Sequence, residues 1–301
     1  MNGLIAVNGK VTKPELASIP VLDRGFLFGD QIFEVFVAFG TKILDVEPHL
    51  ARLRRSAEML NLTIPWSDGE LTFELQALVE QLKFPKTALR LVVTRGEGLG
   101  VKPPASAKAN RIVYAFAPSA ERAELYLNGI QLKRTALGYT DRGGTAKAGA
   151  NYLKSVIAVD QAGKAGFDDV LWTNADGEVT EASTANIFFM AREGDNVQFV
   201  TPPLNSGLLP GITRATVMKL LTMAKIPVVE QLVYADELAR FDEAFVCSTV
   251  RGLVPVAAID KHKMGSARPK AVFRHIERLF LTWVETEVGY RVDWPTGAKA
   301  I

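Results

Sequence analysis

Short apolar runs that alternate irregularly with amphipathic helical segments are the feature that most restricts how this chain can fold. Apolar runs with β-branched and aromatic residues predict strands, and apolar residues at helical spacing, such as Leu50, Leu53 and Ala57, predict helices. Strands are predicted at residues 4–7, 32–38, 89–94, 111–116, 130–134, 169–173, 186–190, 197–200, 244–248 and 254–259, and helices at residues 48–60, 69–82, 152–162, 213–224 and 269–285. Because the two kinds of element follow no regular βαβ rhythm, we expect a mixed α/β (α+β) fold rather than a doubly wound parallel sheet.

The length of 301 residues allows two modest domains or one large one. The chain turns polar at residues 117–124, which read APSAERAE. This segment predicts an interdomain linker at residues 118–124, between an N-terminal domain at residues 1–117 and a C-terminal domain at residues 125–301.

The charge balance argues against several classes of partner. The formal net charge is +2, which does not predict binding to nucleic acid or to an anionic membrane surface. No apolar run approaches the roughly 20 residues that a membrane-spanning helix needs. The first residues, MNGLI, lack the basic and apolar regions of a signal peptide, so we expect a cytoplasmic location.

Disulfide and metal chemistry are not expected either. Cys247 is the only cysteine, which excludes an internal disulfide, and its apolar neighbours predict a buried, inert thiol. His49, His262 and His275 are far apart in the sequence and have no neighbours at ligand spacing. The sequence therefore predicts no metal site of the histidine type.

A glycine-rich segment at residues 96–100, GEGLG, is superficially similar to a nucleotide-binding loop. It lacks the G-x-G-x-x-G spacing, and the residues VKPP follow it in place of a helix, so a mobile loop is the favoured interpretation. The sequence also lacks the G-x-S-x-G elbow and the G-x-x-x-x-G-K-[ST] loop. Hydrolase and P-loop functions are therefore not expected.

Three other segments could carry chemistry, although each has an ordinary alternative when it is taken alone. Lys147 lies among small uncharged residues, where desolvation would lower the pKa of its amine and make it nucleophilic; a surface lysine is the alternative. Gly211 and Thr213 begin a helix whose amides and dipole suit a phosphate; a plain capped helix is the alternative. Glu181 precedes an apolar strand, where a carboxylate needs a cationic partner; a solvated loop glutamate is the alternative.

Together these segments resemble the fold-type-IV (class IV) pyridoxal-phosphate-dependent aminotransferases, and the likeness covers nearly the whole chain. The motifs that carry it are DRGFLFGD at residues 23–30, HLARL at 49–53, TAKAGANYL at 145–153, TEASTAN at 180–186, LPGITR at 209–214 and CSTV at 247–250. Each motif is weak alone, whereas their number, order and spacing set the likeness apart from chance. The resemblance implies a smaller N-terminal α/β domain, a larger C-terminal domain with a barrel-like β core, and a cofactor in the cleft between them.

The resemblance also implies roles for individual residues. Lys147 matches the catalytic lysine, which forms a Schiff base with the cofactor and then moves a proton. Glu181 matches the carboxylate that faces the pyridine nitrogen and keeps it protonated. The other implied cofactor-binding residues are Arg52, Ile212, Thr213 and Thr249 at the phosphate, Leu209 on the ring face and Tyr152 at the cofactor O3′.

The subclass rests on fewer features. Asn-Tyr-Leu at residues 151–153 and the loop at residues 98–101 are similar to branched-chain aminotransferases, and Phe33 stands where D-amino-acid aminotransferases usually have a tyrosine. Ala88 and the turn Val-Arg-Gly at residues 250–252 depart from the branched-chain pattern, which leaves the substrate open. Arg251 either faces solvent or offers its charge to a second substrate carboxylate. The candidate substrate residues are Phe33, Arg90, Val250 and Arg251.

The implied function is a pyridoxal-phosphate-dependent transaminase that moves an amino group from an amino acid, with branched-chain-like L-amino acids favoured, to a 2-oxo acid by a ping-pong aldimine/pyridoxamine mechanism. The alternatives are aminodeoxychorismate lyase, which eliminates pyruvate, and a D-amino-acid or (R)-amine transaminase. A ligand sensor without catalysis is disfavoured, because the lysine, the carboxylate and the phosphate ligands of the family are all present. The resemblance also implies a homodimer in which a loop of one subunit closes the site of the other.

Overall fold

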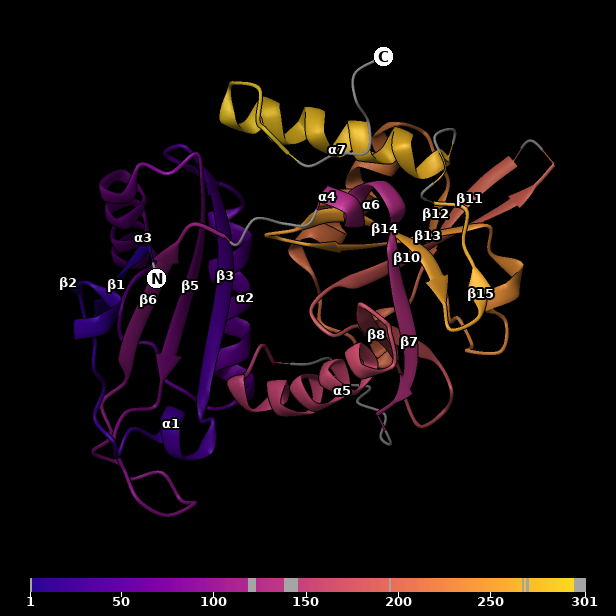
Figure 1. Ribbon diagram of the computed structural model, residues 1–301. Helices are drawn as coiled ribbons and strands as arrows, with labels where there is room; N and C mark the ends of the chain where they lie inside the picture. Colours follow the sequence, from indigo (N-terminus) through magenta and orange to yellow (C-terminus); the bar gives the residue numbers. More distant parts are fainter. Residues whose placement is uncertain are drawn as a thin grey trace. The chain divides into compact units, whose positions relative to one another are not determined.

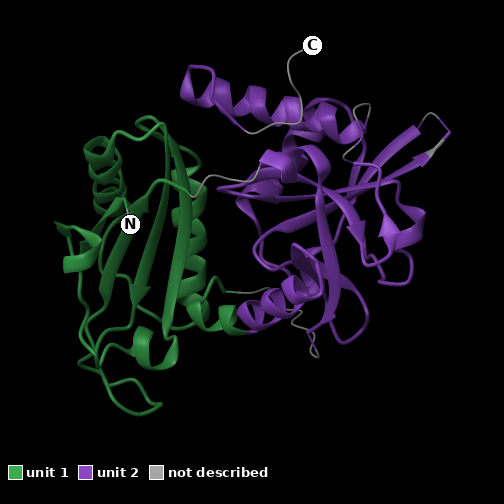
Figure 2. Ribbon diagram, in the orientation of Figure 1, with its two compact units in different colours: residues 1–119, 146–153 green, residues 120–145, 154–301 purple. Residues whose placement is uncertain are grey.

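The computed structural model describes residues 2–118, 123–137, 146–194, 196–266, 268 and 271–294 (Figure 1). The chain divides into two compact units: unit 1 comprises Met1–Ser119 and Ala146–Leu153, and unit 2 comprises Ala120–Thr145 and Lys154–Ile301 (Figure 2). Residues 119–122 of the predicted linker lie outside the described residues, and α4 (Ala123–Asn128) begins before the predicted end of the linker. The predicted domain bounds stay a prediction; the structure adds that residues 146–153 pack with unit 1.

Unit 1 is built on an antiparallel sheet, whose strands within the described residues follow the order β2-β1-β6-β5-β3-β4. The elements of unit 1 are β1 (Gly3–Val7), β2 (Lys10–Thr12), η1 (Pro14–Leu16), α1 (Arg24–Phe28), β3 (Gln31–Phe39), β4 (Lys42–Ile43), α2 (Val46–Met59), α3 (Asp68–Leu82), β5 (Lys86–Thr94), β6 (Asn110–Phe116) and η2 (Gly149–Asn151).

The two faces of the unit 1 sheet have different surroundings. Side chains alternate along a strand, so Ile32, Phe36 and Ala38 of β3 join the core on the face that α2 and α3 cover. Phe33 lies on the opposite face with Ile5, Val92 and Ile112, and Tyr152 packs against this second cluster. The strand β3 therefore carries residues to both sides of the sheet.

Unit 2 contains a second sheet, in which the strands of the described residues follow the order β12-β11-β10-β13-β14-β7-β8-β9, with β15 paired to β14. Its elements are α4, β7 (Ile130–Ala136), α5 (Tyr152–Lys164, which starts in unit 1), β8 (Asp169–Thr173), β9 (Val179–Ala182), β10 (Asn186–Glu193), β11 (Asn196–Thr201), η3 (Leu204–Ser206), α6 (Ile212–Met223), β12 (Val228–Glu230), η4 (Leu238–Arg240), β13 (Glu243–Ser248), β14 (Gly252–Ile259), β15 (His262–Lys263) and α7 (Val272–Val288). The sheet is mixed, because β7 runs parallel to both β14 and β8 while β10 and β13 pair antiparallel. The strand β9 at one end of this order also contacts β10, so the sheet curls upon itself.

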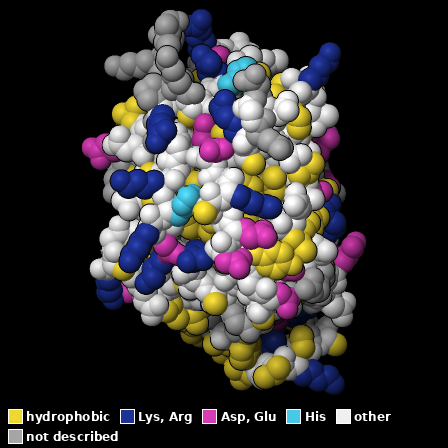
Figure 3. Space-filling view, turned by 90° about the vertical axis from the view of Figure 1, so that its right-hand side faces the viewer, with side chains coloured by type: hydrophobic (Ala, Val, Ile, Leu, Met, Phe, Trp, Pro, Cys, Tyr) yellow, Lys and Arg dark blue, Asp and Glu magenta, His cyan; other side chains and the backbone are white. Residues whose placement is uncertain are grey.

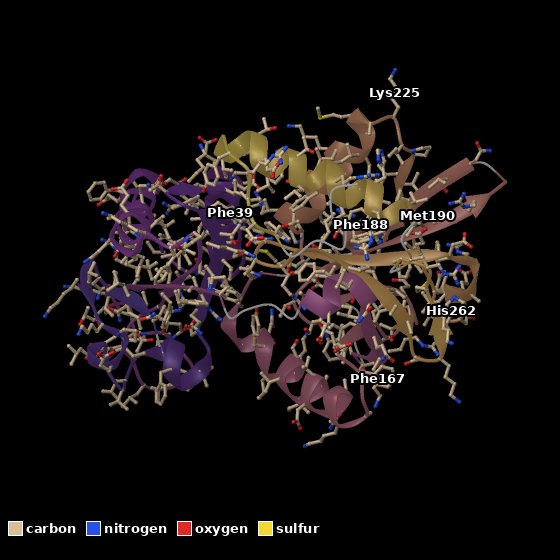
Figure 4. The ribbon with its side chains drawn as sticks, turned by 45° about the horizontal axis from the view of Figure 1, so that its top comes forward. Phe39, Phe167, Phe188, Met190, Lys225 and His262 are labelled. Carbon is tan, nitrogen blue, oxygen red and sulfur yellow. The ribbon has the colours of Figure 1, made fainter. Side chains whose placement is uncertain are left out.

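Aromatic side chains fill the core of unit 2 between the sheet and α7. The rings of Phe188 and Phe245 stack at 5.1 Å between centroids, and Phe273 of α7 lies 5.4 Å from Phe245. Figure 4 shows Phe188 on β10 within the body of the unit, whereas Lys225 projects away from it just after α6. Burial of these rings ties α7 to the sheet.

The predicted strands and helices all correspond to observed elements, although their ends differ by a few residues. Residues 269–270 of the last predicted helix lie outside the described residues, and α7 begins at Val272. The mixed α/β fold is confirmed. The prediction missed α1, α4 and the short strands β2, β4, β9, β12 and β15.

The sequence analysis expected no membrane-spanning helix and a balanced surface charge. No helix in the described part of the chain is both long and apolar enough to cross a membrane. The face shown in Figure 3 carries basic and acidic side chains together, with hydrophobic side chains between them.

The helix α3 begins with a complete capping box. Ser67 Oγ accepts a hydrogen bond from Glu70 N at 3.2 Å, and the Glu70 carboxylate accepts one from Ser67 N at 2.7 Å. We expect Ser67→Ala to lower the free energy of unfolding by about 1 kcal/mol, because two backbone amides lose or loosen their acceptors. Urea denaturation followed by circular dichroism measures the change. Ser67→Asp keeps an acceptor and should recover most of it, and an unchanged midpoint in Ser67→Ala would contradict the assignment.

Candidate active site

The segment around Lys147 lies along the edge of β3. The strand β4 pairs with the far end of β3, at Ala38 and Phe39. Near the other end of β3, Ala148 forms a bridge with Ile32, and Phe33 N donates to Lys147 O at 3.0 Å. The backbone of Lys147 is therefore part of the hydrogen-bonding pattern of the unit 1 sheet.

Gly149 allows this close approach. A Cβ at Gly149 would lie 2.3 Å from Gln31 Nε2 at the start of β3. A larger residue would therefore collide with the Gln31 side chain, and either that side chain or the segment would have to move. The sequence does not explain why small residues surround Lys147. The structure gives one of them, Gly149, a role in packing against β3.

The helix α2 holds Lys147 from the other side. Lys147 N donates to Ser56 Oγ at 3.1 Å, and Ser56 is buried. Ser56 and Arg52 are four residues apart and share one face of α2. One helix thus positions both the lysine backbone and the predicted phosphate-binding arginine.

Four of the predicted site residues meet on the face of the unit 1 sheet opposite α2 and α3. Lys147 Nζ lies 4.7 Å from the centroid of the Phe33 ring, and the guanidinium carbon of Arg90 lies 4.1 Å from it. The Tyr152 ring lies 5.3 Å from Phe33 and 5.5 Å from the Arg90 guanidinium carbon. Phe33 is the common contact of Lys147, Arg90 and Tyr152.

Arg52 is buried and paired with a carboxylate that the sequence analysis missed. Its Nε and Nη2 donate to Glu34 Oε1 and Oε2, each at 2.7 Å, and His49 Nδ1 lies 2.7 Å from Glu34 Oε2. Burial opposes ionisation of Glu34, but hydrogen bonds and charge from Arg52 and His49 outweigh it and hold the pKa of the carboxyl at about 2, below its ordinary 4.5. Burial lowers the pKa of His49 against the opposing effect of Glu34. The guanidinium plane of Arg52 is therefore fixed, and its role at a phosphate stays a prediction.

In unit 2, the Glu181 carboxylate is held by two donors. Asn186 Nδ2 donates to Glu181 Oε2 at 3.0 Å, and Leu209 N donates to Glu181 Oε1 at 3.2 Å. Asn186 Nδ2 also donates to Leu209 O at 3.0 Å. These bonds bring Glu181 and Leu209 together, as two residues of one predicted cofactor shell require.

The start of α6 lies against the same asparagine. Gly211 is the N-cap of α6, and a Cβ there would lie 1.8 Å from Asn186 Oδ1, so a larger residue would displace the Asn186 amide. Ile212 begins the helix and Thr213 is buried. The first amides of a helix have no acceptor within the helix, so Gly211, Ile212 and Thr213 form the kind of helix end that binds phosphate.

The remaining predicted residues lie in the turn between β13 and β14. Thr249 and Val250 are half-buried. Arg251 Nη2 donates to Thr184 Oγ1 at 2.9 Å and lies 3.4 Å from Asp169 Oδ2, with its side chain 30% exposed. Arg251 is therefore anchored to the loop that follows Glu181 while part of it stays accessible.

The glycine-rich loop of unit 1 is more tightly held than the expected mobile loop. Buried Arg24 donates to Gly100 O at 2.7 Å and to Val101 O at 3.0 Å, and also pairs with Asp30. A Cβ at Gly96 would lie 1.8 Å from Lys108 O, so this glycine permits a close crossing of the backbone. These contacts come from residues distant in sequence, which a local pattern does not reveal.

Cys247 is buried in β13, and burial raises the pKa of its thiol to about 12. The prediction of a buried thiol is confirmed, and the raised pKa supports its being inert. Within the described residues, no group of three or more His, Cys, Asp or Glu side chains is arranged to hold a metal ion.

A family model described as Amino-transferase class IV matches residues 31–259. The chain belongs to the class IV aminotransferase family. This class IV aminotransferase is 30% identical over 289 residues to the putative branched-chain-amino-acid aminotransferase of Methanocaldococcus jannaschii, covering 96% of the chain and 98% of the relative.

Solved structures agree with this assignment. The branched-chain amino acid aminotransferase of Escherichia coli superposes with a TM-score of 0.86 at 26% identity, covering 97% of each chain. The branched-chain aminotransferase of the archaeon Thermoproteus uzoniensis, solved with norvaline, gives a TM-score of 0.82 at 26% identity, covering 95% of each chain. The predicted family, the fold-type-IV architecture and the aminotransferase class of this enzyme are confirmed.

We expect the contribution of Glu34 to stability to depend on pH. Because its pKa is lowered from 4.5 to about 2 on folding, its ionised form adds stability that is complete above pH 4.5 and is lost as the pH falls towards 2. Glu34→Gln should therefore lower the free energy of unfolding at neutral pH by about 3 kcal/mol. The difference from the wild type should shrink as the pH is lowered below 4.5.

Denaturant titrations over a pH series measure this difference. Glu58→Gln removes a carboxylate from the exposed side of the same helix, α2, and should change stability little at any pH. A Glu34→Gln effect of equal size at neutral and acidic pH would show that the lost ion pair is not the cause.

Proposed function

We propose that this class IV aminotransferase uses pyridoxal phosphate to move an amino group from a branched-chain-like L-amino acid to a 2-oxo acid. The observation that carries the proposal is the placement of Lys147, whose backbone is held by Ser56 and Phe33 while its amine lies on the Phe33 ring. A lysine fixed at its backbone, with a defined side-chain direction, suits a Schiff-base role. The names of the relatives support the reaction and the substrate class.

The residues present fit pyridoxal phosphate by two features, both in contact with Asn186. The start of α6 has a glycine against the Asn186 amide, and its helix-end amides suit a phosphate. Glu181 has both carboxylate oxygens in hydrogen bonds that fix its direction, as a partner of a ring nitrogen needs. We assign the phosphate to Arg52, Ile212, Thr213 and Thr249, the ring face to Leu209 and the O3′ contact to Tyr152.

The chemistry divides among these residues. When bound, pyridoxal phosphate supplies an electron-withdrawing ring that stabilises negative charge at the substrate Cα. Lys147 Nζ would hold the cofactor covalently, and its free amine would act as the base that takes the proton from the substrate Cα. The negative charge of Glu181 would hold a proton on the ring nitrogen.

Substrate recognition is assigned to both units. Phe33 offers an apolar surface to a branched side chain, and Arg90 offers a positive charge beside it. Val250 lies in the β13–β14 turn, and Arg251 of the same turn would meet a second carboxylate, such as that of a dicarboxylic amino acid. Aminodeoxychorismate lyase and D-amino-acid or (R)-amine transaminase activities are the alternatives that a substrate panel decides.

An exposed apolar surface on unit 1 supports a homodimer. The glycine-rich loop joins the segment before α1 through Gly98 N, which donates to Leu22 O at 3.1 Å. Around this junction Val21, Phe26, Leu99 and Val101 are 69%, 66%, 70% and 88% exposed. Apolar side chains gathered in this way are typical of a surface that another chain covers. We propose that a second copy of the chain covers this surface.

We also propose that the enzyme works in the cytoplasm.

Borohydride reduction tests the role of Lys147. Reduction of the protein with pyridoxal phosphate should attach the cofactor to the peptide that contains Lys147, as mass spectrometry will show. Lys147→Ala should lose transamination, because the amine that would serve as both nucleophile and base is removed. Lys154→Ala, on the same stretch of chain, is the matched control and should keep activity. Attachment to a different lysine would overturn the assignment.

A substrate panel tests the proposed specificity. We expect L-leucine and L-valine to be better donors than D-alanine by at least about tenfold in kcat/KM, a difference of about 1.4 kcal/mol. Pyruvate released from aminodeoxychorismate without a 2-oxo acid would instead identify a lyase. Arg251→Ala should reduce kcat/KM for L-glutamate more than for L-leucine; equal reductions would exclude Arg251 from recognition of the second carboxylate.

A further inference from the structure

Two asparagines of unit 2 make the same kind of bridge between neighbouring parts of the chain. Asn174 Nδ2 donates to Glu178 Oε2 at 2.7 Å and to Ser206 O at 3.1 Å. Asn186 Nδ2 donates to Glu181 Oε2 and to Leu209 O, each at 3.0 Å. Each amide thus joins a glutamate to a carbonyl of the segment that runs from η3 to α6. Both asparagines are buried.

Only the Asn186 bridge involves residues of the proposed cofactor site. The second oxygen of Glu181 accepts from Leu209 N at 3.2 Å, and Asn186 Oδ1 lies against Gly211 at the start of α6. The acceptors at Nδ2 fix the orientation of the amide, because a reversed amide would set Oδ1 against a carboxylate and a carbonyl. One side chain therefore contacts the carboxylate and the helix end together.

We propose that Asn186 is a positioning residue that holds the Glu181 carboxylate and the N-terminus of α6 as one rigid group. The inference rests on the proposed function, in which Glu181 meets the ring nitrogen and the start of α6 meets the phosphate. The ring nitrogen and the phosphate are different parts of one rigid cofactor, so the separation of the two protein groups must match it. A glutamate side chain has several rotatable bonds, and donors at both oxygens remove that freedom before the cofactor binds.

No other side chain of similar size meets these demands. Aspartate has nearly the same shape but would place an oxygen against Glu181 Oε2 and Leu209 O. The two carboxylates would repel each other, and both acceptors would lose their donor. Alanine removes the bridge and the contact with Gly211. The two substitutions therefore separate loss of the bridge from reversal of its polarity.

The test measures binding of pyridoxal phosphate to the cofactor-free protein, the pH dependence of the absorbance of the bound cofactor, and the rate of the half-reaction with an amino donor. Asn186→Ala should weaken binding by about tenfold, and Asn186→Asp by more. Both should shift the absorbance titration, because a displaced carboxylate no longer holds the proton on the ring nitrogen. Asn174→Ala is the matched control: it should lower the unfolding midpoint but leave cofactor affinity and the titration as in the wild type.

A double-mutant cycle separates positioning from general loosening. If Asn186 acts on the half-reaction through Glu181, then Asn186→Ala should slow it by about a hundredfold in the wild type but by less than about threefold in Glu181→Gln. Equal slowing in both backgrounds would overturn the inference. If Asn186→Ala fails to fold, Asn186→Asp, which keeps the side-chain volume, serves in the same cycle.

The outcomes also distinguish this inference from the proposed function. A wild-type protein that does not bind pyridoxal phosphate would overturn both. A wild-type protein that binds it, beside an Asn186→Ala protein with the same affinity and the same absorbance titration, would overturn the inference alone. An Asn174→Ala protein that loses affinity as strongly as Asn186→Ala would also overturn it, because any loosening of the segment would then suffice.

Discussion

Backbone pairing between residues 147–148 and the start of β3 is the interaction on which the arrangement of unit 1 around Lys147 depends. The pairing joins these residues to a strand more than a hundred residues earlier in the sequence. Because β3 directs alternate side chains to opposite faces, a segment at its edge meets Phe33 on one face and Ser56 of α2 on the other. The backbone of Lys147 thus contacts α2 on one side of β3, while its amine lies over Phe33 on the other.

In each unit the protein fixes the direction of a charged side chain. Glu34 and Arg52 are buried, and the hydrogen bonds and charges around Glu34 outweigh the cost of removing its carboxylate from water. What the pair provides is a fixed direction for the guanidinium group. Glu181 is fixed in a comparable way, by an amide side chain and a backbone amide rather than by a cation. In each unit a charged group is oriented by the protein before any ligand arrives, which is the basis of preorganised electrostatics.

The sequence predicted the long elements well because their apolar periodicity extends over several turns or strand repeats, as in α2 and β5. It missed β4 and β15, in which two residues carry no periodic pattern. Local motifs led to the prediction of Lys147, Glu181 and the start of α6 as site residues. They did not identify Ser56, whose partner is 91 positions away, or Asn186, whose second acceptor is 23 positions away. Glu34 is visible in the sequence as a single carboxylate within the apolar run at residues 32–38, but its pairing with Arg52 of α2 is evident only from the fold. Likewise, nothing in the small residues around Lys147 indicates that they pair with β3.

The buried thiol of β13 has a practical meaning for work on this enzyme. Cys247 is the only cysteine of the chain, and its pKa of about 12 leaves almost no thiolate at neutral pH. Maleimides and similar reagents react with thiolates at the surface, so the native fold presents no target to them. A cysteine introduced at an exposed position, for example in place of Lys225, would then be the single labelling site, and a fluorophore could be attached without first removing a native cysteine.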